Sequence, residues 1–91
     1  MQKLEPTKTL TIYTENKPAV IARIANLLRK RNISIEAIRA DTKKMVANVN
    51  GVKASVIEIV AEFKDEHQCE NVARQIERLI NVLKVNSKIK F

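Results

Sequence analysis

The chain has 91 residues, of which 45% are hydrophobic and 3% aromatic, so it is long enough for one domain with an aliphatic core and is not a disordered chain. Its 17 basic and 10 acidic residues give a net charge of +7, but the longest basic run is only Arg29 to Arg31, which favours a solvated surface. A single cysteine excludes an internal disulfide framework. There is no signal peptide and no run of about 18 apolar residues, so we expect a cytoplasmic protein without a membrane partner.

The first half of the chain predicts a strand, a helix and a second strand. "TLTIYT" (residues 9–14) alternates as a strand does, with Leu10 and Ile12 on one face. Pro18 suits the first turn of a helix that ends near Arg31 and has an apolar stripe of Val20, Ile24, Leu27 and Leu28. "ISIEAIRA" (33–40) predicts the second strand. The alternation of apolar and polar residues is interrupted at Ala37 and Ile38, which is typical of a β-bulge.

The second half predicts a strand, a helix and a last strand. A polar connection ends at the turn Asn50-Gly51 and leads to "KASVIEIVAEF" (53–63), with Ile57, Ile59, Ala61 and Phe63 on one face and Val56, Glu58, Val60 and Glu62 on the other. Asp65 and Gln68 resemble a capping box for a helix whose stripe is Cys69, Val72, Ile76, Leu79 and Ile80. In the tail, Leu83, Val85, Ile89 and Phe91 alternate with Lys84, Asn86, Lys88 and Lys90.

The order βαββαβ predicts an α+β fold, the ferredoxin-like sandwich with a four-stranded antiparallel sheet and two helices on one face. We expect one domain over residues 1–91, with its core from about residue 8 to 90. In this plan the first and third predicted strands are central, and the second and fourth are edges.

The two predicted edges differ in how well they are protected. The last strand has Lys84, Lys88 and Lys90, which discourage pairing with another chain. The second strand has no lysine or proline, so we expect a homodimer through this edge, with Ile33, Ile35 and Ile38 as its contacts. The alternative is an edge covered by the connection that follows Asp41.

The sequence has no catalytic constellation. His67 has no cysteine or second histidine at ligand spacing, which leaves no metal site, and Cys69 falls on an apolar helix stripe. Glu58 and Glu62 are explained as cross-strand charge pairs toward the lysine-rich last strand. We therefore expect no enzymatic activity, no catalytic residue, no metal and no cofactor.

RNA-binding domains that share this element order stack bases on aromatic residues of the central strands. Here Tyr13 is the aromatic residue available there, and the third strand has Glu58. Nucleic acid is thus an unlikely partner. A basic nucleic-acid-binding protein using the Arg29 to Arg31 cluster is the weakest of the functions considered.

Two segments resemble a known family. "TIYTENKPAVIARIANLLRKRNISIEAI" (11–38) resembles the start of the ACT domain in the regulatory small subunit of acetohydroxyacid synthase, also called acetolactate synthase, and "RLINVLKV" (78–85) resembles the junction of its second helix and last strand. The resemblance covers about residues 8 to 88, as in the short single-domain form. It implies a subunit of branched-chain amino-acid biosynthesis that binds and modulates a catalytic large subunit, with feedback by a valine-type amino acid.

The resemblance also implies an effector site shared between two chains. Its residues would be Asn16, Ala19 and Val20 of one chain with Ser34 and Ile35 of the other. Ala19 replaces a family Gly, and Ser34 replaces a family Asn. Independently of the family, a helix N-terminus has free N–H groups that suit a carboxylate. The alternative function is a stand-alone ACT module that senses an amino acid and acts on another enzyme or regulator.

Overall fold

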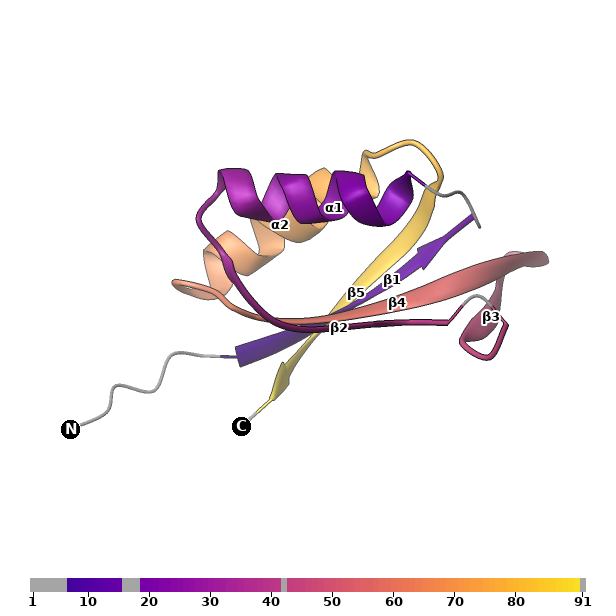
Figure 1. Ribbon diagram of the computed structural model, residues 1–91, viewed down its shortest axis with the longest axis horizontal. Coiled ribbons are helices and arrows are strands. Elements are labelled where there is room, and N and C mark those ends of the chain that lie inside the picture. Colours follow the sequence, from indigo (N-terminus) through magenta and orange to yellow (C-terminus); the bar gives the residue numbers. More distant parts are fainter. Residues whose placement is uncertain (1–6, 16–18, 42, 91) are drawn as a thin grey trace.

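The computed structural model describes residues 7–15, 19–41 and 43–90, with side chains as far as residue 86. Its elements are β1 (Thr7–Thr14), α1 (Val20–Lys30), β2 (Ser34–Ala40), β3 (Val46–Val49), β4 (Val52–Glu62), α2 (Glu66–Glu77) and β5 (Val82–Lys90). The strands pair antiparallel in the order β2-β4-β1-β5, and both helices lie on one face of the sheet (Figure 1). The predicted ferredoxin-like α+β fold is confirmed, with β1 and β4 in the centre.

The connection predicted to be irregular contains an additional strand. β3 pairs with the first residues of β4, from Val46 opposite Ser55 to Val49 opposite Val52. Asn50 and Gly51 have φ angles of 50° and 81°, the positive values that a two-residue hairpin turn requires. Sequence analysis missed β3 because its four residues lack a distinctive pattern. The described part of the connection thus continues along β4 instead of covering the outer edge of β2.

The core lies between the sheet and the two helices. β1 contributes Leu10 and Ile12, and β4 alternates between buried residues toward the helices and half-buried residues on the open face. The predicted helix stripes are confirmed for the fully buried members: Val20, Ile24, Leu28, Cys69, Val72 and Ile76. Leu27 and Leu79 pack against this core while partly exposed.

One predicted core position, Ile80, is wrong, and the predicted alternation of the last strand fails at Leu83. Ile80 is 71% exposed because α2 ends at Glu77 and the chain turns before β5. Leu83 is 39% exposed because Tyr13 pairs with Lys84 while Thr14 pairs with Val82, which makes Leu83 the extra residue of a bulge. Val82 and Val85 pack against the core.

The bulge expected in the second strand is confirmed. Ile35 pairs with Ala61 and Ala37 pairs with Val60, so Glu36 is the extra residue, one position before the predicted interruption. After it, Ile38 points to the same sheet side as its core-facing partner Ile59.

The ends of the helices fix where the neighbouring strands begin. The carboxylate of Asp65 accepts from the N–H of Gln68 at 2.8 Å, and the amide oxygen of Gln68 accepts from the N–H of Lys64 at 2.7 Å, one residue before the position in a standard capping box. At the end of α1, Ile33 N–H donates to the Leu28 carbonyl at 3.1 Å. Together with the left-handed Asn32 (φ 57°), this bond forms a Schellman motif that leads directly into β2.

Candidate functional site

The first predicted half-site is the start of α1. Arg23 N–H donates to the Ala19 carbonyl at 3.1 Å, which leaves the N–H groups of Val20, Ile21 and Ala22 ahead of the helical ladder. The first turn has no acidic residue, and no described side chain caps it. These backbone groups therefore offer a carboxylate both hydrogen-bond donors and the positive end of the helix dipole.

The predicted residues at this helix end differ in exposure and in the groups that they can offer a ligand. Ala19 is exposed and has a φ of −84°, so its methyl group imposes no backbone strain. The side chain of Val20 is 1% exposed and belongs to the core, which leaves only its backbone N–H for a ligand. Asn16 lies outside the described residues.

The second predicted half-site is the start of β2. Ser34 and Ile35 line a hollow of about 500 Å³, together with Ala25, Arg29, Asn32 and Ile33. The Arg29 guanidinium donates to Asn26 Oδ1 at 3.1 Å and keeps further N–H groups free for an anion. A cation, a hydroxyl group and an aliphatic floor suit a small molecule with a carboxylate and a short apolar side chain.

Sequence analysis missed Ala25 and Arg29 as part of this hollow. Their i, i+4 spacing, which places both on one flank of α1, was the available signal. That signal is weak, because only the path of β2 beside the end of α1 makes the flank a wall of the hollow.

The two half-sites do not meet within one chain. They lie at opposite ends of the 11-residue helix α1, about 16 Å apart along its axis. The sheet register agrees, because Ser34 pairs with Glu62 at the far end of β4, whereas Thr14 at the α1 end of β1 pairs with Ser55. A ligand that uses both half-sites must lie between two copies of the chain.

The outer edge of β2 has an exposed apolar side chain. Ile38 is 41% exposed, Ile35 is half-buried and Ile33 is 7% exposed, so Ile33 belongs mainly to the core. Within the described residues β2 pairs with β4 alone, which leaves its other edge available for a strand.

The other polar residues singled out in the sequence have structural explanations. His67 is exposed. Arg39 Nη1 of β2 lies 3.2 Å from Oε1 of Glu58 of β4. A cross-strand charge pair is therefore present, but its basic partner comes from β2 and not, as predicted, from the lysine-rich last strand. The described residues contain no group of three or more metal-ligating side chains, and no described helix is long and apolar enough to cross a membrane.

Cys69 lies in the first turn of α2, and its side chain is buried in the core. Burial raises the pKa of the Cys69 thiol above its ordinary value of 9.0, and the nearby Lys8 ammonium opposes this effect. Lys8, which sequence analysis left outside the first strand, is itself buried, with Nζ 3.4 Å from Oε2 of the exposed Glu66. Cys69 is 1% exposed and belongs to the hydrophobic core, so it contributes to packing.

Comparison with curated proteins gives relatives of one kind. The acetolactate synthase small subunit of Mycolicibacterium smegmatis is 32% identical over 88% of this chain and 43% of its own length, and that of Mycobacterium leprae is 34% identical over 88% and 43%. The probable acetolactate synthase small subunit of Archaeoglobus fulgidus is 32% identical over 86% of this chain and 45% of its own length. The chain thus spans less than half the length of these relatives.

Solved structures agree with the fold. The ACT domain of GTP pyrophosphokinase from Chlorobium tepidum is 13% identical and superposes with a TM-score of 0.66 over 93% of this chain and 100% of its own. An ACT domain protein from Streptococcus pneumoniae is 11% identical, with a TM-score of 0.65 over 94% and 91%. The family model described as the AHAS small subunit-like ACT domain matches residues 10–84. The chain therefore belongs to the family of AHAS small subunit-like ACT domains.

Proposed function

We propose that this chain is a non-catalytic regulatory subunit that binds the catalytic large subunit of acetolactate synthase and changes its activity. The observation that carries this proposal is the family match over residues 10–84, together with relatives that are named as small subunits of that enzyme.

The subunit acts as a homodimer through the outer edge of β2. Two copies of β2 extend the sheet across both chains, which covers the exposed Ile38 and gives the edge N–H and C=O groups partners. Ile35 lies beside Ile38 at this edge and is half-buried already in the single chain. The β2 edge that this dimer uses lies within the single domain expected over residues 1–91.

A small amino acid of the valine type binds between the copies. Its carboxylate meets the N–H groups at the start of α1 of one chain, near Ala19, while Asn16, the other predicted residue of this half-site, lies outside the described residues. The Arg29 guanidinium of the other chain also faces this carboxylate, the Ser34 hydroxyl accepts from the ammonium, and the aliphatic side chain lies against Ile35 in the hollow. The volume of the hollow, about 500 Å³, is in the range of small-molecule sites.

The test is an activity assay of the purified catalytic large subunit of acetolactate synthase. It is run with and without this chain, and each arm with and without valine. We expect the chain to raise the activity and to co-elute with the large subunit, and we expect valine to lower the activity only when the chain is present. Unchanged activity together with separate elution would refute the regulatory role.

If the two subunits co-elute but valine has no effect on the activity, only the effector site is refuted.

The alternative function is an amino-acid sensor that acts on another enzyme. It would be indicated if the chain binds an amino acid but does not affect the large subunit. In that case valine or another amino acid raises the unfolding temperature of the chain while the large subunit is unaffected.

A further inference from the structure

Exposed apolar side chains gather at the end of the molecule where α2 turns into β5 and β3 turns into β4. Ile80 is 71% exposed, Val52 47% and Leu83 39%. Both turns lie at one end of the sheet, on the right in Figure 1, because Thr14 at the end of β1 pairs with Val82 on one side and with Ser55 on the other. We call Val52, Ile80 and Leu83 the turn patch. Large exposed apolar side chains at one place mark an interaction surface.

A hollow of about 590 Å³ adjoins the turn patch on the open face of the sheet. Tyr13, Ala47 and Val49 form its apolar part, and Leu83 and Lys84 form the wall on β5. The bulge that displaces Leu83 from the core creates this wall. Asn48 and Asn50 also line it, so the hollow has the size to receive a side chain of another protein and offers it both apolar and polar contacts.

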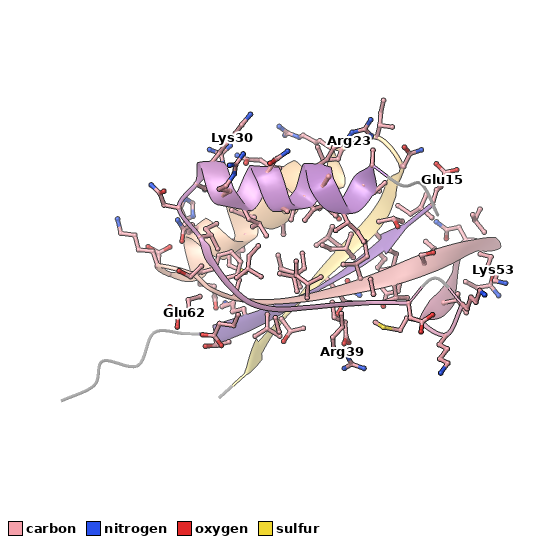
Figure 2. The ribbon with its side chains drawn as sticks, in the orientation of Figure 1. Glu15, Arg23, Lys30, Arg39, Lys53 and Glu62 are labelled. Carbon is pink, nitrogen blue, oxygen red and sulfur yellow. The ribbon has the colours of Figure 1, made fainter. Side chains whose placement is uncertain are left out.

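Cations surround this apolar centre. Lys53 and Lys84 are exposed on the flanking strands and Arg78 is exposed at the end of α2; Figure 2 shows Lys53 at the hairpin. The ion pairs among described residues lie elsewhere, at Lys8 and at Arg39. Of the acidic residues nearby, Glu15 already accepts from the Asn81 amide at 2.9 Å, and Glu77 directly precedes Arg78 at the end of α2. The free charges thus favour a partner that offers carboxylates.

We propose that the turn patch and its hollow are the surface through which this chain docks the larger catalytic subunit. The inference rests on the proposed function and assigns the place of contact. The partner contributes an apolar side chain that fills the hollow and carboxylates that face Lys53 and Lys84. An apolar centre with a charged rim is the usual composition of a protein interface, whereas a polyanion would leave the apolar centre uncovered.

The location leaves the β2 edge free for the second copy of the chain. β2 pairs with residues 57–62 of β4, while the turn patch lies at the opposite end of β4 and on β5. One dimer can therefore dock a large subunit with each of its two turn patches.

The test is the affinity of the full chain for the purified catalytic large subunit, measured by calorimetry at low and high salt. We expect Leu83→Asp to weaken binding by about tenfold or more, since it places a charge in the apolar centre. Lys84→Glu should also weaken binding and reduce its salt dependence. Lys64→Glu makes the same charge change at the far end of the sheet, before α2, and should bind as the wild type does.

Each result has a distinct meaning. If the wild type binds and both Leu83→Asp and Lys84→Glu bind equally well, the docking surface is elsewhere and the inference is wrong. If Leu83→Asp instead changes the sedimentation of the chain alone, a second copy covers the patch and the inference is also wrong. If the wild type does not bind, the proposed function itself fails. Should Leu83→Asp not fold, Ile80→Asp at the 71% exposed position takes its place.

Discussion

The backbone N–H of Asn32 donates to the carbonyl oxygen of Arg29 at 3.0 Å, while Asn32 itself has a φ of 57°. This left-handed residue ends α1 and sets the start of β2, so it places Ser34 beside Arg29 in the hollow. A β-branched side chain is strained at such a φ, by about 1 to 2 kcal/mol. The geometry of the second half-site thus depends on the backbone conformation of a residue that also lines it.

Replacements of Asn32 should therefore change the free energy of unfolding according to how well each residue tolerates a positive φ angle. Asn32→Val is expected to lower the free energy of unfolding by about 1 kcal/mol, and Asn32→Gly to keep or raise it. Urea unfolding followed by circular dichroism measures both. Asn71→Ala, at an exposed position of α2 where φ is not positive, is the matched control and should be neutral or stabilising. Equal stability of the Val and Gly variants would show that the Schellman motif is unimportant.

Arg29 should contribute to amino-acid binding through its guanidinium. Arg29→Met keeps the length of the side chain but removes its donors, and we expect valine affinity to fall by about tenfold, as the loss of a charged hydrogen bond would cause. Wild-type chain with valine at about 100 times its dissociation constant should gain about 2.7 kcal/mol of stability, which thermal unfolding reports. Arg23→Met, on the outer face of α1 in Figure 2, is the control and should bind valine normally. A wild-type response in Arg29→Met would place the ligand outside this hollow.

Ala19 tests the other half-site. Ala19→Asp adds a carboxylate at the N-terminus of α1, where the helix dipole favours it, so the chain should become more stable by about 0.5 kcal/mol. The same carboxylate should repel the carboxylate of valine and abolish its effect on unfolding temperature. Ala19→Asn, similar in size but uncharged, should retain the valine response. If the Asp variant responds as the wild type does, the ligand carboxylate does not bind at the start of α1.

The main elements of the fold could be predicted because their apolar periodicity is regular. Leu10 and Ile12 in β1 and the stripe from Cys69 to Ile76 in α2 face the core as their spacing indicates. The errors at Ile80 and Leu83 arise where this period continues in the sequence although the backbone changes. Asn81 adopts a φ of 75°, and the following bulge shifts the strand register by one residue. Apolar spacing does not encode either feature.

The candidate site was predicted only in part. Ser34 and Ile35 were identified from a local resemblance, and the structure places both in one hollow. Arg29 was missed as a partner of Ser34, since their proximity depends on the reversal of the chain at Asn32. The turn patch was also missed, because Val52 and Leu83 lie far apart in sequence and the hollow beside them exists only once β5 pairs with β1.

The buried Cys69 should make stability depend on alkaline pH. Its folded-state pKa is raised by burial, so the folded protein holds this proton more tightly than the unfolded chain does. The contribution is fully present below the unfolded pKa, about 9.0, and is lost as pH rises through that value toward the folded pKa. Urea unfolding between pH 7 and about 10 should show a steeper loss of stability in the wild type than in Cys69→Ala. Parallel pH profiles for the two proteins would contradict this prediction.

Ile38 should decide whether the chain dimerises through β2. Ile38→Asp places a charge on the exposed β2 edge, where two strands would otherwise meet, and inward-pointing or edge charges prevent such pairing. We expect wild-type chain to sediment as a dimer and Ile38→Asp as a folded monomer with a weakened response to valine, since each site needs both chains. Leu83→Asp is the matched control, because Leu83 is 39% exposed against 41% for Ile38 but lies at the turn patch. It should remain a dimer. A dimeric Ile38→Asp variant would exclude the β2 edge as the interface, and a monomeric Leu83→Asp variant would move the interface to the turn patch.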